Sequence, residues 1–462
     1  MLSVFGAIIM DIPYLIALPV LVLGAFIVIV DFKQIYWLLM AFVPLSIEFE
    51  IGSFGTDLPT EPLIVGLMFL YFIHRAYNKP TAHDTQFTRH ILVWFLALHW
   101  VWIFIAAVVS NDFVVSIKFW LAKSWYIIVF VFLTARYIQT EADFKKLFWV
   151  LLLPLGLGTM YVIAKFRSLG FAFDEVNESV IPFFRNHVNY AAILSLFLPF
   201  IVFAIGWYKR FTFKWYFLIG SALWILLAIQ LSYTRTAYVA IALGVAAYFA
   251  FQWKLIRYVS IGAIIVMILG ISWLLQENRY INFAPNYQKT VTHTEFDDLI
   301  SATYQFTDIS TMERVYRWVA GLHMVEDEWV MGFGPGNFYF FYKGYTEAAF
   351  RTYVSNNPEH SGIHNYFLMT FVEQGIFGLI IFVLFIFAIL IKGEVIYHET
   401  PKHKVTRRNI IMSVLVSMVI IYAFLLINDM LEAAKIGAIF FINIAVLINM
   451  DLLNRKELKE NL

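Results

Sequence analysis

The sequence predicts an all-α polytopic membrane protein with 12 or 13 transmembrane helices and one large loop that carries short helices. Two observations lead to this prediction. Of the 462 residues, 61% are hydrophobic and only 14% are charged, whereas soluble domains carry about 25% charged residues. Apolar stretches of about 20 residues, the length that crosses a bilayer, also recur along most of the chain.

These apolar stretches are separated by short polar connections, and each is expected to form one span. They lie near residues 12–30, 35–50, 62–78, 91–109, 119–135, 147–165, 187–206, 215–233, 237–253, 258–275, 370–391, 409–427 and 436–450. The first part of the chain leaves the number open. Either residues 1–10 form half of a hairpin broken at Asp11-Ile12-Pro13, or the stretch 35–50 does not fully cross the membrane.

Lys and Arg are concentrated in every second connection, which the positive-inside rule assigns to the cytoplasm. These connections contain Arg75, Lys79 and Arg89; Arg136, Lys145 and Lys146; Lys209, Arg210 and Lys214; Lys254 and Arg257; residues 392–408; and the tail from Arg455. The external side then receives the acidic segment 48–61, the link 234–236 and the long loop. The chain is therefore divided into residues 1–275 with N-terminal spans, the loop 276–364, and residues 365–462 with C-terminal spans and a cytoplasmic tail.

The long loop is expected to contain at least one helix. Thr311 is the predicted N-cap, residues 315–325 have helical spacing, and Gly332 is the predicted stop. The sequence Gly332-Phe333-Gly334-Pro335-Gly336 then forces a turn. This turn lacks the Lys-Ser/Thr of a P-loop, so it does not indicate nucleotide binding.

Composition excludes several classes of function. The formal net charge is +1, so the sequence shows no large basic face and predicts no nucleic-acid partner. The many aromatic residues are explained by the belts that aromatic side chains form at the two membrane interfaces. The chain has no cysteine, which excludes disulfides, Cys-ligated zinc and a thiol nucleophile.

His364 lies where the long loop re-enters an apolar segment. The pair His364-Asn365 is followed after nine residues by Gly375, and then by Gly378. Histidine exchanges a proton near neutral pH, so at a membrane surface it is a candidate general base, and the alternative is an interfacial histidine without a catalytic role. The two glycines permit close helix packing. His360 and His364 also suggest a metal pair, but no third ligand has a fitting spacing.

Three further positions offer positive charge on the same side. Arg235 lies in a link too short to leave the membrane surface, where a planar guanidinium suits a diphosphate, although a snorkelling arginine is the alternative. Arg314 and Arg317 share one helical face in the loop, and Arg317 is also placed to pair with Glu313. Arg185 and Asn189 lie at the start of a helix, whose free N–H groups attract anions; capping is the alternative for Asn189.

These motifs together resemble the O-antigen ligase and polymerase superfamily of bacterial membrane glycosyltransferases. The family pattern is His-Asn/Ser/Gln, nine residues, Gly-x-x-Gly, which His364 to Gly378 matches without a gap. The family's Ser/Thr-Arg corresponds to Thr234-Arg235. Its Arg four residues before Trp, followed by a Gly-x-Gly-x-Gly turn, corresponds to Arg314, Trp318 and residues 332–336.

The resemblance implies transfer of a glycan from undecaprenyl diphosphate to an acceptor hydroxyl, with inversion and without a metal or other cofactor. The acceptor is another lipid-linked repeat unit or lipid A core, and membrane lipids surround the protein. His364 would take the acceptor proton, Arg235, Arg314, Arg185 and Arg317 would bind the diphosphate, and Asn365 and Asn189 would support the site. It further implies the bacterial cytoplasmic (inner) membrane, with the active site facing the periplasm.

Three other functions are compatible with a polytopic chain. A transporter or flippase of polysaccharide precursors would show two similar halves and charges at mid-membrane, which this sequence lacks. A protein O-oligosaccharyltransferase would share the donor chemistry but transfer to protein hydroxyls. A structural scaffold would retain its function when His364 is replaced by Ala.

Overall fold

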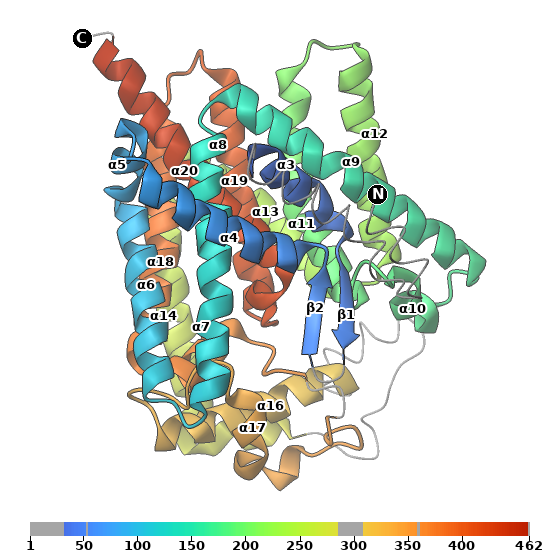
Figure 1. Cartoon of the computed structure of the whole chain (residues 1–462). Helices are drawn as coiled ribbons and strands as arrows, with labels where there is room; N and C mark the ends of the chain where they lie inside the picture. Colours follow the sequence, from blue (N-terminus) through green and yellow to red (C-terminus); the bar gives the residue numbers. More distant parts are fainter. Residues whose placement is uncertain (1–31, 52–53, 285–307, 358–360, 461–462) are drawn as a thin grey trace, which may run out of the picture.

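The computed structural model describes residues 32–51, 54–284, 308–357 and 361–460. Long helices form a bundle, and the helices of the long loop lie together at one end of it (Figure 1). We call this the loop end, and the other the opposite end. Within the described residues, nine helices are long and apolar enough to cross a membrane, so the chain is an all-α multi-pass membrane protein.

The nine candidate spans agree closely with predicted stretches. They are α6 (Ile91–Val108), α7 with its continuation (Phe113–Tyr137), α9 (Glu141–Ser168), α11 with its continuation (His187–Trp207), α12 (Phe213–Leu231), α14 (Ile256–Leu275), α18 (Tyr366–Glu399), α19 (Val405–Leu425) and α20 (Ala434–Glu460). Two further predicted spans form the less apolar helices α4 (Thr60–Tyr77) and α13 (Arg235–Gln252). The predicted span 12–30 lies outside the described residues.

The predicted span 35–50 does not form one continuous helix. Helix α3 (Phe32–Phe42) and a short 3-10 turn end at Leu45, and the chain continues as the antiparallel strands β1 (Ile47–Ile51) and β2 (Phe54–Leu58). The sequence did not predict these strands. Lys435 at the start of α20 donates to the carbonyl and hydroxyl oxygens of Ser46, both at 2.7 Å, and so holds the base of the hairpin against the bundle.

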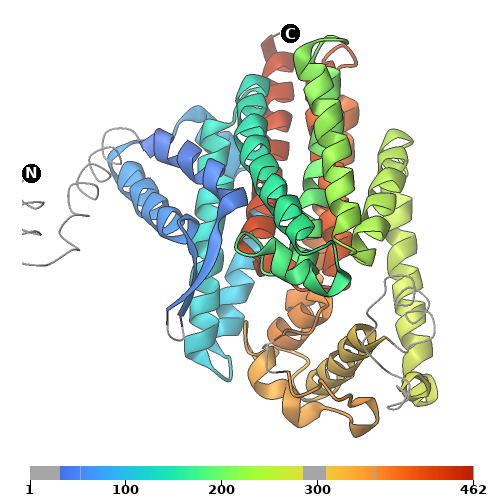
Figure 2. The same ribbon diagram turned by 90° about the vertical axis from the view of Figure 1, so that its right-hand side faces the viewer.

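The centre of the bundle consists of α11, α19 and α20. Their apolar windows are 72%, 83% and 94% buried, whereas that of α14 is 11% buried. Helix α14 is correspondingly peripheral, and Figure 2 shows it in yellow-green at the right-hand edge. Side chains on all faces of a central helix meet protein, while α14 presents most of its surface to lipid.

Buried charges at the opposite end are paired. Asp451 of α20 lies 3.0 Å from the Nε2 of His90, and Arg407 of α19 bonds to Glu141 at 3.0 Å and Glu457 at 2.7 Å. Leaving the buried Asp451 or Arg407 without a partner would cost about 3–5 kcal/mol. Connections that the basic residues assign to one side of the membrane therefore do meet at one end.

Helices α16 (Ile309–Asp327) and α17 (Phe338–Phe341) lie at the loop end (Figure 1), and the short helix α10 (Val176–Val180) precedes α11. The short helix α5 (Ala82–Thr88) lies at the opposite end, where His83 Nε2 is 3.1 Å from Asn449 Oδ1 of α20. The predicted loop helix is α16, but Asp308 caps it and not Thr311, since the Asp308 carboxylate accepts from both the backbone N–H and the hydroxyl of Thr311. Helix α16 ends at Asp327, before the predicted stop at Gly332.

Candidate functional site

His364 lies just before α18, in a sharply turned backbone. Asn365 is the N-cap of α18, and its side chain accepts from the N–H of Leu368 at 2.9 Å. His364 has a φ of 56°, which an L-residue adopts at a cost unless its surroundings hold it there. Its backbone N–H donates to the Asp429 carboxylate, in the link between α19 and α20. Its Nδ1 lies 3.8 Å from Asp429 Oδ1, beyond hydrogen-bond distance.

The arginines of α16 set the electrostatics around this ring. Burial, together with the smaller effect of the positive charges of Arg314 and Arg317, lowers the pKa of His364 to about 3. The ring is therefore neutral near pH 7 and able to accept a proton. The pKa of Asp429 is raised by burial, while the His364 N–H and the charges of Arg317 and Arg185 oppose that rise.

Arg314 lies at the centre of the positive charges. Burial and the nearby Arg235 lower the pKa of its guanidinium to about 10, while Asp308 and Asp429 act in the opposite direction. At pH 7 the group remains charged. In the part of the chain that the structure describes, its Nε–H is buried and has no hydrogen-bond partner. A buried charged donor without a partner is suited to binding an anionic group.

Arg235 connects a bundle helix to the loop. It is the first residue of α13, and its Nη2 lies 3.1 Å from Asp308 Oδ2. Asp308 is 1% exposed and caps α16. The Arg235–Asp308 pair therefore fixes the start of α16 beside the start of α13, which places Arg314 near Arg235.

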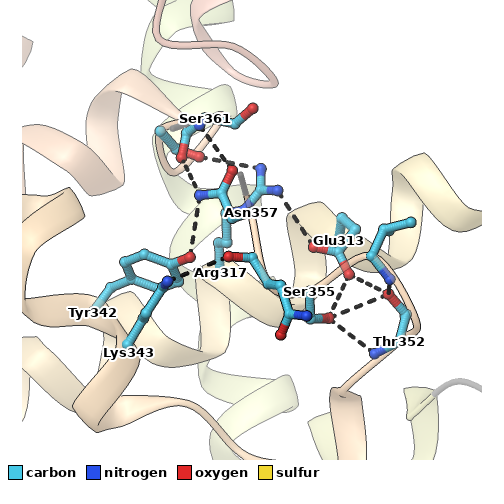
Figure 3. Close-up of polar contacts among 11 residues, drawn as sticks. Glu313, Arg317, Tyr342, Lys343, Thr352, Ser355, Asn357 and Ser361 are labelled. Carbon is cyan, nitrogen blue, oxygen red and sulfur yellow. Dashed lines mark hydrogen bonds and ion pairs between the residues drawn. The ribbon is translucent and has the colours of Figure 1, made fainter. Parts of the chain in front are cut away.

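Arg317 belongs to a buried network, drawn in Figure 3. Its Nη2 lies 3.3 Å from Glu313 Oε2, as the spacing predicted, and its Nη1 donates to the carbonyl of Gly362 at 3.3 Å. Glu313 also accepts from the hydroxyls of Thr352 and Ser355. Arg317 thus holds the chain two residues before His364, in addition to any contact with a ligand.

The glycine turn 332–336 packs into a break in α18. Gly375 has a φ of 66° and a ψ of −173° inside that helix. The N–H groups of Gly336 and Phe338 donate to the buried carboxylate of Glu373 at 2.9 and 3.1 Å. The N–H of Gly334 donates to the Glu373 carbonyl at 2.9 Å. Gly378 packs against Trp102, where a Cβ would meet the indole. The motif glycines therefore position the loop against α18.

The α11 start lies at the edge of this cluster. Asn186 caps α11 by accepting from the backbone N–H of Asn189 at 2.9 Å, and His187 Nδ1 lies 2.8 Å from Asn177 Oδ1. Arg185 is exposed and acts on Asp429 through its charge. The structure thus brings Arg314, Arg317 and Asp429 to His364, joins Arg235 to them through α16, and places Arg185 beside Asp429.

Asp429 and Glu432 were missed in the sequence. Glu432 Oε1 accepts from Lys123 Nζ at 2.5 Å and from the Tyr366 hydroxyl at 2.7 Å, which fixes the link that carries Asp429. The signal for Asp429 was present. An acid in a short link between two apolar helices is as costly as Arg235, and the reasoning applied to Arg235 would have found it.

Metal ligands do not gather at this site. Across residues 32–51, 54–284, 308–357 and 361–460, the structure brings together no group of three or more His, Asp or Glu side chains that could hold a metal ion. His360, considered with His364 as a metal pair, lies outside these ranges.

Comparison with known proteins bears directly on this arrangement. Residues 220–383 match the family model described as O-antigen ligase. No curated protein matches the chain. The matched segment contains Arg235, Arg314, Arg317 and His364, together with the glycines of the turn and of the α18 break, while Arg185 and Asp429 lie outside it. The match over residues 220–383, about a third of the chain, supports the resemblance to the O-antigen ligase and polymerase superfamily.

Proposed function

We propose that the protein transfers a glycan from undecaprenyl diphosphate to an acceptor hydroxyl, at the outer face of the bacterial cytoplasmic membrane. One observation carries the proposal: Arg314 and Arg317 of α16 act on a neutral, partly buried histidine that has a carboxylate neighbour, and Arg235 of α13 acts on Arg314. A dianionic leaving group and an acceptor that must lose a proton require this combination.

In the proposed reaction, Nε2 of His364 takes the proton of the acceptor hydroxyl as its oxygen attacks the anomeric carbon. The bond from that carbon to the diphosphate oxygen breaks, and undecaprenyl diphosphate leaves with the bonding electrons. Attack from the face opposite the leaving group inverts the anomeric centre. Arg314, Arg235 and Arg185 stabilise the negative charge on the diphosphate, as a divalent metal does in other transferases.

Asp429 has a defined part in this proposal. When His364 becomes positive, the Asp429 carboxylate 3.8 Å from Nδ1 stabilises the imidazolium. Arg317, bonded to Glu313 and to the carbonyl of Gly362, orients the chain that carries His364. Asn365 fixes the start of α18 as its N-cap, and Asn189 supports the start of α11.

The test is a transfer assay with purified protein in liposomes that contain a lipid-linked glycan. His364→Ala and Asp429→Asn are compared with the wild-type protein, and with Lys343→Ala as an exposed control in the same loop. Loss of transfer by the first variant, with unchanged thermal unfolding, is expected. Wild-type transfer by His364→Ala would contradict catalysis by this residue and favour a scaffold.

The same assay separates the acceptors. With donor alone, longer lipid-linked glycans indicate a polymerase. A product that forms only when lipid A core is added indicates a ligase, and one that forms only with a Ser-containing peptide indicates a protein O-oligosaccharyltransferase. Movement of the donor across the bilayer without any new glycosidic bond would indicate the flippase alternative.

A further inference from the structure

The loop between α16 and α17 has an apolar edge next to a transmembrane helix. Trp329 is 56% and Val330 36% exposed. Their backbone is fixed to the break in α18: the N–H of Ile376 donates to the Trp329 carbonyl at 2.9 Å, and Gly375 packs directly against the Val330 carbonyl. The backbone of Trp329 and Val330 therefore lies level with residues 375–377 along the axis of α18.

Residues 375–377 lie at the loop-side end of an apolar stripe on α18 that faces the membrane. After Gly375, α18 continues for 16 residues without a charged side chain, from Ile376 to Ile391, which covers about 24 Å at 1.5 Å per residue. Phe377, Ile380 and Leu384 are each nearly half exposed, and their spacing puts them on one face. An exposed apolar face on a transmembrane helix is a face toward lipid.

The turn between α6 and α7 is packed against the same loop and has apolar residues on both sides. Val109, Phe113 and Val114 are all more than half exposed and flank the polar residues Ser110, Asn111 and Asp112. The turn is joined to the loop, because the N–H of Asn111 donates to the Phe333 carbonyl at 3.1 Å and the Ser116 hydroxyl to the Pro335 carbonyl at 2.9 Å. Trp102 of α6 also donates to the Gln374 carbonyl of α18 at 2.9 Å.

We propose that Trp329 and Val330, together with the α6–α7 turn, form an edge that is immersed in the headgroup and upper acyl layer of the membrane. Trp is favoured at this depth because its ring is apolar and its N–H can meet water or headgroups. Exposure of these side chains to water would be unfavourable, because it leaves apolar surface hydrated. The loop is thereby anchored to the bilayer at a fixed depth, and this holds whether or not the protein transfers glycans.

The absence of cysteine allows a direct test. Single-cysteine variants carry a nitroxide label in protein reconstituted into phosphatidylethanolamine and phosphatidylglycerol liposomes. Collision with oxygen, which partitions into lipid, is compared with collision with a water-soluble nickel chelate. Leu384→Cys gives the lipid reference and Lys343→Cys, an exposed loop residue, the water reference. Trp329→Cys, Val330→Cys and Val114→Cys report on the edge.

The expected result is an oxygen-to-chelate ratio at positions 329, 330 and 114 that is severalfold above that of position 343 and below that of position 384. A ratio at 329 and 330 equal to that of position 343 would overturn the proposal, even if position 114 remained lipid-accessible. If Trp329→Cys does not fold, Val330→Cys decides the outcome alone, because its neighbour remains intact.

Discussion

Replacement of Gly375 by Ala should separate the loop from α18. The backbone at this position has a φ of 66° and a ψ of −173°, a region that only glycine adopts without strain, and the strain for alanine is about 1–3 kcal/mol. This strain alone shifts the balance between docked and undocked loop by about 5- to 150-fold. The added Cβ would also collide with the Val330 carbonyl, and a backbone atom cannot rotate away as a side chain can.

Undocking relieves this strain at the expense of backbone hydrogen bonds. The N–H groups of Ile376, Phe333 and Gly334 each lose a partner at 2.9 Å, at about 0.5–1.5 kcal/mol net for each bond. Together these bonds oppose undocking by about 1.5–4.5 kcal/mol, which is comparable with the strain. The collision with the Val330 carbonyl adds to the strain, so we expect the docked fraction to fall, and transfer to fall in proportion to it. Hydrogen exchange at residues 333–338 and the liposome transfer rate measure the two effects.

Gly262→Ala is the matched control. Gly262 lies in the exposed helix α14 with nothing within 4 Å of an added Cβ, so this change should be neutral or stabilise the helix by about 0.5–1 kcal/mol. The reasoning is refuted if Gly375→Ala keeps the wild-type exchange protection at Phe333 and Gly334. Slow exchange combined with lost transfer would mean that the glycine acts on the site by another route.

Four further outcomes are expected. His364→Ala should lower transfer by about 10²–10⁴-fold without affecting membrane insertion, which glycan profiling of a complemented deletion strain checks; normal chain length would count against a general base. Arg235→Lys should reduce transfer by about tenfold or more, because an ammonium cannot reproduce two-pronged contact; full activity with purified lipid-linked donor would remove this role. Because the pKa of His364 is lowered to about 3, its neutral form persists as the pH falls, so kcat/KM should stay level between about pH 8 and 5. The pH below which kcat/KM falls should be higher in Arg314→Gln, because this change removes a positive neighbour of His364 and so raises the pKa of the ring. If that pH is unchanged, the titration belongs to another group. Transfer should survive EDTA, and a loss that magnesium or manganese restores would overturn the metal-independent reaction.

Much of this architecture follows from local properties of the sequence. A stretch of about 20 apolar residues must satisfy its backbone polar groups internally, so it forms a helix wherever it occurs, and nine predicted stretches are found as candidate spans in the described residues. The strands 47–51 and 54–58 were not predicted, because alternating apolar and acidic residues in an otherwise apolar region also fit a polar connection. The cap of α16 was misplaced by three residues, since Asp308 and Thr311 are both good N-caps and only their mutual hydrogen bonds decide between them.

The site was harder to predict, because its members come from five separate parts of the chain. Motif spacing found His364 and the arginines within residues 185–364. It gave no indication that Asp429 reaches His364, because that contact depends on how α19 and α20 pack. Spacing also suggested the Glu313–Arg317 pair, but not that Glu313 would bind Thr352 and Ser355 and so bury both charges.

The distribution of these residues sets a limit on how the protein can be divided. The segment that matches the family model ends at residue 383, inside α18 and before both of the most deeply buried helices, α19 and α20. A gene fragment cut at that boundary would encode the recognisable motifs without Asp429, and without the two helices against which α11, α13 and α18 pack. Recombination between relatives should therefore preserve function only when the exchanged piece extends through α20, so that the motif segment and its helical support are inherited together.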